Sequence, residues 1–175
     1  MSFDDLLEEL ESLQTLLRRS REHKDLKKRL LQMYSFKNIV SPEDDNWYKR
    51  SAEEEKAFWI LKTSKYGDVL PHFLNLKASS QNKQYFYTIF RGEEIEPAII
   101  KIPRLYPELP PNSLLSLSKK IEVYTSHTDP SKCLGNLVKG KWDEEGRMGI
   151  AHWLLFVEIF LILTNNPVKL NETLF

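Results

Sequence analysis

The sequence has one cysteine, Cys133, in 175 residues. A single cysteine cannot form an internal disulfide bond, and it cannot build a zinc site by itself. A single cysteine therefore excludes a secreted fold that is stabilised by internal disulfide bonds. The N-terminus, Met-Ser-Phe-Asp-Asp, is acidic and amphipathic, unlike the basic and apolar start of a signal peptide. We therefore expect the protein in a reducing cytoplasm.

The sequence also lacks a net charge and a long apolar run. Lysine plus arginine equal aspartate plus glutamate, 25 against 25, so no global field attracts nucleic acid or an anionic membrane. Residues 150–163 form the longest apolar run, which His152 and Glu158 interrupt. This run is too short to span a bilayer and predicts a buried helix. We expect neither nucleic acid nor a membrane as a partner, although a local charged patch remains compatible with these numbers.

Motifs for cofactors and metals are missing as well. The chain has no glycine-rich phosphate loop and no Gly-x-Ser-x-Gly elbow, and its four histidines show no ligand spacing. We therefore expect no cofactor and no metal.

The N-terminal part predicts helices. Leucines at alternating four- and three-residue steps indicate a long helix over residues 3–33, which either packs on its own domain or serves as a docking or dimerisation helix. Residues 38–50 read as a loop, and the capping-box pattern at Ser51 predicts a second helix that Gly67-Asp68 ends. This division gives an N-terminal helical extension, residues 1–50, and a domain over residues 51–175.

The remainder predicts an α+β fold. Alternating residues indicate strands over 72–77 and 85–90, followed by 98–102 and 114–117. Connections of hairpin size imply a four-stranded antiparallel meander, and an apolar helix over 149–163 closes the core.

Cys133 is the residue of greatest chemical interest. Turn and surface residues from Gly135 to Lys141 follow it, which favours a loop position for the thiol. The alternative is a small buried hydrophobe, because free cysteine is among the most buried residue types.

Five features in a fixed order resemble the ubiquitin-conjugating enzyme family. They are Tyr106-Pro107-x-x-Pro110-Pro111, His127, Cys133, Trp142 nine residues later, and an apolar helix that ends at Asn165-Asn166-Pro167. The resemblance covers about residues 51–167 and implies the UBC fold of that family, a four-stranded meander flanked by helices.

The chain departs from the family at two points. Of the His-Pro-Asn segment only His127 matches, since Thr128 and Asp129 follow it, and Trp142 comes one residue later than usual. The missing asparagine and the Cys-Leu-Gly sequence look more like divergent bacterial relatives, some of which are encoded in antiviral defence operons beside a nucleotide cyclase. That narrower resemblance implies a role in antiviral defence and a nucleotide cyclase as a candidate target.

The resemblance implies that Cys133 carries a ubiquitin-like modifier as a thioester and passes it to a lysine of a protein target. An activating enzyme would deliver the acyl group already activated, so no Cys–His relay is required. The site needs an oxyanion donor, and Asp129 cannot donate when it is ionised. Asn136 is a possible substitute, unless it is only a turn residue, and Asn112 is a more remote one.

His127 and the acidic residues after Trp142 each have two possible roles. His127 either holds the loop backbone or shuttles protons, and the family favours the structural role. Residues 143–145 are acidic and either orient an incoming lysine or form a solvated turn. The residues expected to be scaffolding are Trp142, Tyr106, Pro107, Pro110 and Pro111.

Two other functions remain open. The incomplete match to the His-Pro-Asn segment is compatible with a catalytically inactive UBC-like binding or adaptor module. If the Tyr-Pro-Pro segment is a coincidence, the chain is an α+β interaction domain with the leucine-rich helix as its main binding element.

Overall fold

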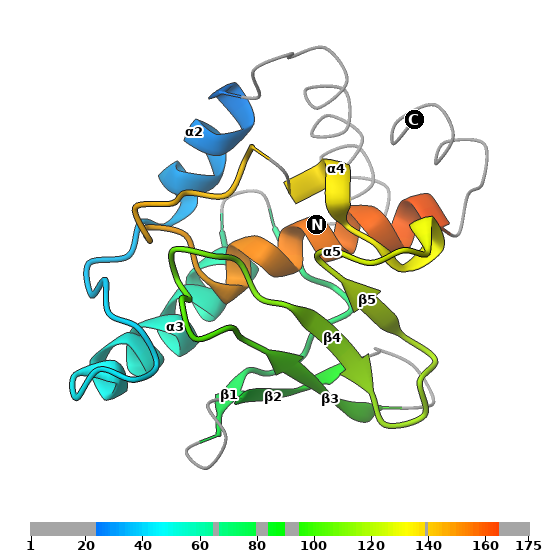
Figure 1. Ribbon diagram of the computed structural model, residues 1–175, viewed down its shortest axis with the longest axis horizontal. Coiled ribbons are helices and arrows are strands. Elements are labelled where there is room, and N and C mark those ends of the chain that lie inside the picture. The colour runs from blue at the N-terminus through cyan, green and yellow to red at the C-terminus, as the bar shows by residue number, and fades with distance from the viewer. Residues whose placement is uncertain (1–23, 65–66, 80–83, 90–94, 139, 165–175) are drawn as a thin grey trace.

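The computed structural model describes residues 24–64, 67–79, 84–89, 95–138 and 140–164. Within these residues the chain folds as an α+β domain with one antiparallel sheet (Figure 1). The part of the predicted long helix that falls here is α2, Lys24–Met33. Residues 3–23 of that prediction lie outside the described residues.

Helix α3, Trp47–Lys62, starts earlier than the sequence predicts. The prediction of a start at Ser51 is wrong, and residues 47–50 are helix rather than loop. Asn46 precedes the helix without a side-chain cap, and its backbone N–H donates to Asp44 Oδ1 at 2.8 Å. Trp47 packs edge-on against Tyr85 and Tyr106, so tertiary contacts extend the first turn. The helix ends at Lys62, before Gly67.

The sheet has five strands in the order β1-β2-β3-β4-β5, each antiparallel to its neighbour. The predicted meander is therefore confirmed, but the count of four strands is wrong. The strands are β1 Lys77–Ala78, β2 Gln84–Ile89, β3 Glu96–Lys101, β4 Ser113–Ser116 and β5 Glu122–Tyr124. The sequence did not predict β5, which has only three residues.

Residues 72–76 do not form the predicted strand. Lys62 Nζ instead binds the carbonyl oxygens of Leu70 and Phe73, at 3.1 and 2.7 Å. The backbone N–H of His72 donates to Glu158 at 2.9 Å. Charged side chains from two helices thus bind the backbone of His72 and Phe73, and the segment pairs with β2 through a single bridge, Phe73 to Ile89, with the Leu74 N–H donating to the Thr88 carbonyl at 2.9 Å.

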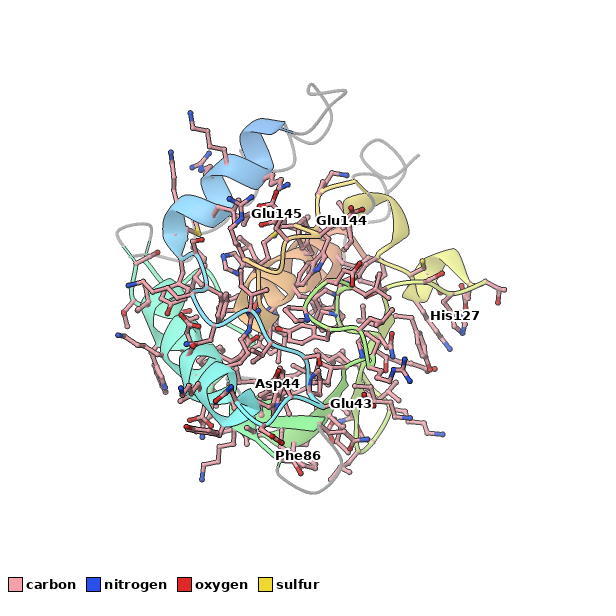
Figure 2. All side chains as sticks on the ribbon, turned by 60° about the vertical axis from the view of Figure 1, so that its left-hand side comes forward. Glu43, Asp44, Phe86, His127, Glu144 and Glu145 are labelled. Atoms are coloured by element: carbon pink, nitrogen blue, oxygen red, sulfur yellow. The ribbon has the colours of Figure 1, made fainter. Side chains whose placement is uncertain are left out.

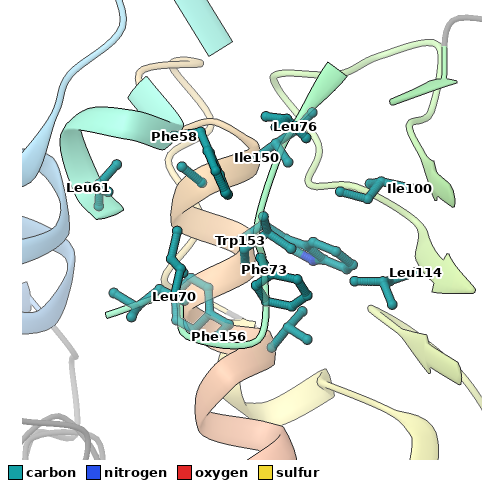
Figure 3. Close-up of a cluster of buried hydrophobic side chains, with 14 of the residues drawn as sticks. Phe58, Leu61, Leu70, Phe73, Leu76, Ile100, Leu114, Ile150, Trp153 and Phe156 are labelled. Carbon is teal, nitrogen blue, oxygen red and sulfur yellow. The ribbon is translucent and has the colours of Figure 1, made fainter. Parts of the chain in front are cut away.

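Helix α5, Ile150–Thr164, closes the core as predicted. It lies with α3 on one face of the sheet, and both helices and the sheet contribute to a single hydrophobic cluster (Figures 1 and 3). Residues 150–160 are all buried, which fits the mostly apolar sequence of this helix, and its polar residues His152 and Glu158 both have hydrogen-bond partners. Leu30 and Phe36 belong to the same cluster, so α2 and the segment after it pack on this core. No helix among the described residues is long and apolar enough to cross a membrane.

Candidate functional site

Cys133 lies at the end of a short 3-10 helix, Pro130–Lys132, directly beside strand β5. It forms an isolated parallel bridge with Tyr124, and the backbone N–H of Leu134 donates to the Tyr124 carbonyl at 2.7 Å. The side chain is half-buried, and its Sγ donates to the Thr125 carbonyl at 3.5 Å. The thiol is thus held at a fixed place on the rim of the sheet.

A cleft of about 600 Å³ lies near Cys133, which is not itself one of the residues that line it. Thr125 and Gly135 line it, and both lie close to the sulfur: a Cβ added to Gly135 would be 3.1 Å from Sγ. Pro110 and Trp142 also line this cleft. Cys133 therefore lies next to two residues that line a cleft of the size of ligand-binding sites.

The Tyr106-to-Pro111 segment is fixed to three parts of the molecule. The Tyr106 hydroxyl donates to Glu54 in the core, and Trp142 Nε1 donates to the Pro107 carbonyl at 2.9 Å. The Thr125 hydroxyl donates to the Pro111 carbonyl. Burial and the Glu54 carboxylate raise the pKa of Tyr106, so its hydroxyl stays protonated and keeps donating. These contacts place the segment as a wall of the cleft.

His127 is exposed and lies at the edge of the molecule (Figure 2). Its ring stacks on Tyr124 with centroids 4.3 Å apart, and Nδ1 accepts from the backbone N–H of Asp129 at 3.0 Å. The Asp129 carboxylate accepts from the backbone and hydroxyl of Ser131, at 3.0 and 2.7 Å, and these bonds lower its pKa. Both residues organise the loop that leads to Cys133.

The two asparagines occupy different places. Asn136 is in the short helix α4, Gly135–Val138, and its side chain lies outside the described set. Asn112 is exposed at the start of β4, and its carbonyl accepts from the backbone N–H of Thr125 at 2.9 Å. Among the described side chains, no hydrogen bond joins the Cys133 thiol to a histidine, an asparagine or a carboxylate.

The acidic residues after Trp142 also line the cleft. Asp143 is buried and pairs with Arg147 at 2.7 Å and with Lys27 at 3.3 Å. Burial opposes its charged form, but the hydrogen bond from Arg147 lowers the pKa of Asp143 below its usual value. Glu144 and Glu145 are exposed next to each other on the same loop (Figure 2). Asp143 thus holds the loop together, and Glu145 pairs with Arg147 at 2.9 Å. The cleft is lined by these acidic residues and by Lys27.

Sequence reasoning missed Thr125, which contacts Cys133, the proline-rich segment and α5. A single threonine at a strand end has no distinguishing pattern, so only the fold reveals this position. Among the described residues, no group of three or more histidine, cysteine or acidic side chains lies close enough to hold a metal ion. Comparisons with models of known protein families, with curated proteins and with solved structures found no match to this chain.

Proposed function

We propose that the protein is a conjugating enzyme of the ubiquitin-conjugating type, with Cys133 as the acyl carrier. The observation that carries the proposal is the half-buried Cys133 thiol, bonded to Thr125, which lines a cleft together with Glu108, Leu109 and Pro110 of the Tyr106-to-Pro111 segment. A thiolate is a strong nucleophile and a good leaving group, so it can accept an acyl group and release it.

The surroundings of the thiol favour acyl transfer from an activated donor over hydrolysis of an unactivated bond. A cysteine hydrolase needs a base within hydrogen-bond reach, and among the described side chains none is bonded to Cys133. In the proposed reaction Cys133 attacks the thioester of an activating enzyme, whose sulfur leaves with the proton. A lysine amine of the target then attacks the new thioester, and Cys133 leaves as a thiol.

The architecture supports the same proposal. An antiparallel meander is followed by the cysteine and then by a buried helix, which is the order that the resemblance implies. Trp142 contacts Pro107 as a scaffold residue of such a site would. The proposed partners are a ubiquitin-like modifier, its activating enzyme and a protein target, for which a nucleotide cyclase in a bacterial antiviral system is the candidate.

The test is thioester formation. The protein is incubated with ATP and with pairs of activating enzyme and modifier from the same genomic neighbourhood, then separated on a non-reducing gel. We expect an adduct that thiols remove, and in Cys133→Ser either no adduct or a thiol-resistant ester. Absence of loading with every such pair, while the activating enzyme itself charges, would reject the enzyme.

A second function is an inactive UBC-like adaptor that binds a modifier without covalent chemistry. The use of Asp129 to cap the short helix favours it, because this carboxylate faces its own loop and supplies no oxyanion donor. The adaptor predicts that Cys133→Ser binds the modifier as tightly as the wild-type protein and that neither protein loads.

A further inference from the structure

Thr125 connects Cys133 to the centre of the molecule. Its hydroxyl donates to the Pro111 carbonyl and accepts from Trp153 Nε1 at 2.9 Å. Trp153 is fully buried in α5, so this contact satisfies an indole N–H that would otherwise lack a partner in the core. The Thr125 hydroxyl therefore both donates and accepts a hydrogen bond.

The backbone of Thr125 is fixed in the same way. Its N–H donates to the Asn112 carbonyl at 2.9 Å, and its own carbonyl accepts from the N–H of Gly135 at 3.1 Å. The same carbonyl accepts from Cys133 Sγ at 3.5 Å. One residue thus joins Asn112, directly before strand β4, to the start of α4, the buried helix α5 and the thiol.

We propose that Thr125 is the positioning residue of the Cys133 thiol. The hydroxyl, held by Trp153 and Pro111, fixes the backbone carbonyl, and the carbonyl holds Sγ beside Thr125, which lines the cleft. This proposal rests on the proposed function for its catalytic meaning, but the positioning itself is a property of the free protein and needs no modifier.

The first test measures alkylation of Cys133 by iodoacetamide in the folded protein. Cys133 is the only cysteine, so mass spectrometry follows one reaction. Thr125→Val keeps the shape but removes both hydroxyl bonds, whereas Thr125→Ser keeps them. Each bond limits local opening, so we expect roughly tenfold faster alkylation in Thr125→Val and a rate within about twofold of wild type in Thr125→Ser.

A control separates positioning from loss of stability. Leu61 is fully buried in α3, and Leu61→Val lowers stability without touching the contacts of Thr125. Guanidinium unfolding first checks that Leu61→Val and Thr125→Val have lost a similar free energy of unfolding. At equal stability, Leu61→Val should still be alkylated at the wild-type rate. A wild-type or slower rate in Thr125→Val, an equal acceleration in Thr125→Ser, or an equal acceleration in Leu61→Val would each overturn the proposal.

Loading kinetics test the catalytic meaning separately. With a functional activating enzyme, Thr125→Val should lower kcat for thioester formation and leave KM for the charged activating enzyme unchanged, because only the nucleophile is displaced. A rise in KM with unchanged kcat contradicts the positioning role. Failure of the wild-type protein to load rejects the proposed function, while the alkylation result still decides whether Thr125 positions the thiol.

Discussion

Arg50 and Glu54 form a fully buried ion pair on α3, with 2.9 Å between Nε and Oε1. The guanidinium also donates to the carbonyls of Gly146 and Met148, at 2.8 and 2.7 Å. Glu54 accepts from the Tyr106 hydroxyl and from the backbone N–H of Ile150 at 2.9 Å. Although burial opposes the charged form, Glu54 raises the pKa of Arg50. The pair thus ties α3 to both segments that flank the cleft.

Removal of one partner of this pair should be costly. Glu54→Gln leaves the Arg50 charge buried without its counterion, so we expect a loss of about 3–5 kcal/mol in the free energy of unfolding by guanidinium. Glu43→Gln is the matched control, because its contact with Arg104 is exposed and 4.0 Å long. A small effect at Glu54, similar to that at Glu43, would contradict this account of the core.

Gly149 is required by close packing. A Cβ at this position would lie 2.2 Å from Phe36 Cε2 and 2.5 Å from Glu54 Oε2. Gly149→Ala should therefore cost about 1–3 kcal/mol of stability through overpacking. Adding Phe36→Leu to Gly149→Ala should recover part of this loss, since the smaller side chain relieves one clash. Denaturant titrations give the free energy of unfolding of both single variants and of the double variant. If the loss in the double variant equals the sum of the two single losses, the clash is contradicted.

Trp142→Phe tests the link between Trp142 and the Tyr106-to-Pro111 segment. The variant loses the donor to the Pro107 carbonyl, and we expect a loss of about 1–3 kcal/mol because that carbonyl is left unpaired. The control is Trp59→Phe, on the exposed side of α3, where 47% of the side chain is accessible and little change is expected. Thermal melts of both variants give the comparison, and equal shifts would count against the link.

His152 should make the protein sensitive to acid. It is fully buried, accepts from the N–H of Gly149 and contacts the Leu30 carbonyl, both at 3.0 Å. Burial lowers its pKa from 6.5 to about 4. Between pH 6.5 and pH 4 the histidine is therefore protonated in the unfolded chain but neutral in the folded chain. The free energy of unfolding falls as the pH drops through this range, by up to about 1.4 kcal/mol per pH unit. Urea unfolding at several pH values gives the free energy of unfolding as a function of pH. In His152→Gln this free energy should fall less between pH 6.5 and pH 4 than in the wild-type protein. An equal fall in both proteins would show that another group causes the loss.

His72 should have the opposite effect. The hydrogen bond to Glu158, 2.6 Å from Nδ1 to Oε2, raises the pKa of His72 although burial opposes this. A raised pKa means that the folded chain holds the proton more tightly than the unfolded one. Its contribution to stability is full below pH 6.5 and is lost as the pH rises through the raised value. His72→Gln should thus destabilise the protein more at pH 6 than at pH 9, as urea titrations at both values would show; an equal loss at both would contradict the pair.

Much of the fold was predictable because its cues are local. The strands predicted over residues 85–90, 98–102 and 114–117 match β2, β3 and β4 to within two residues, and the apolar run predicted α5. The same cues failed over residues 72–76, where Lys62 and Glu158 hold the backbone. They also failed at the start of α3, which depends on the contacts of Trp47 with two tyrosines.

The sequence by itself determined the α+β class and singled out Cys133, since residue order and side-chain period are properties of the chain. Only the tertiary structure decided what surrounds the thiol. The Thr125 carbonyl, the cleft and the distant Trp153 come together through long-range packing, which no local spacing records. The same packing placed Arg50 and Glu54 in the core, where Gly146, Met148 and Tyr106 bind them, because burial makes a charged group depend on partners from elsewhere in the chain.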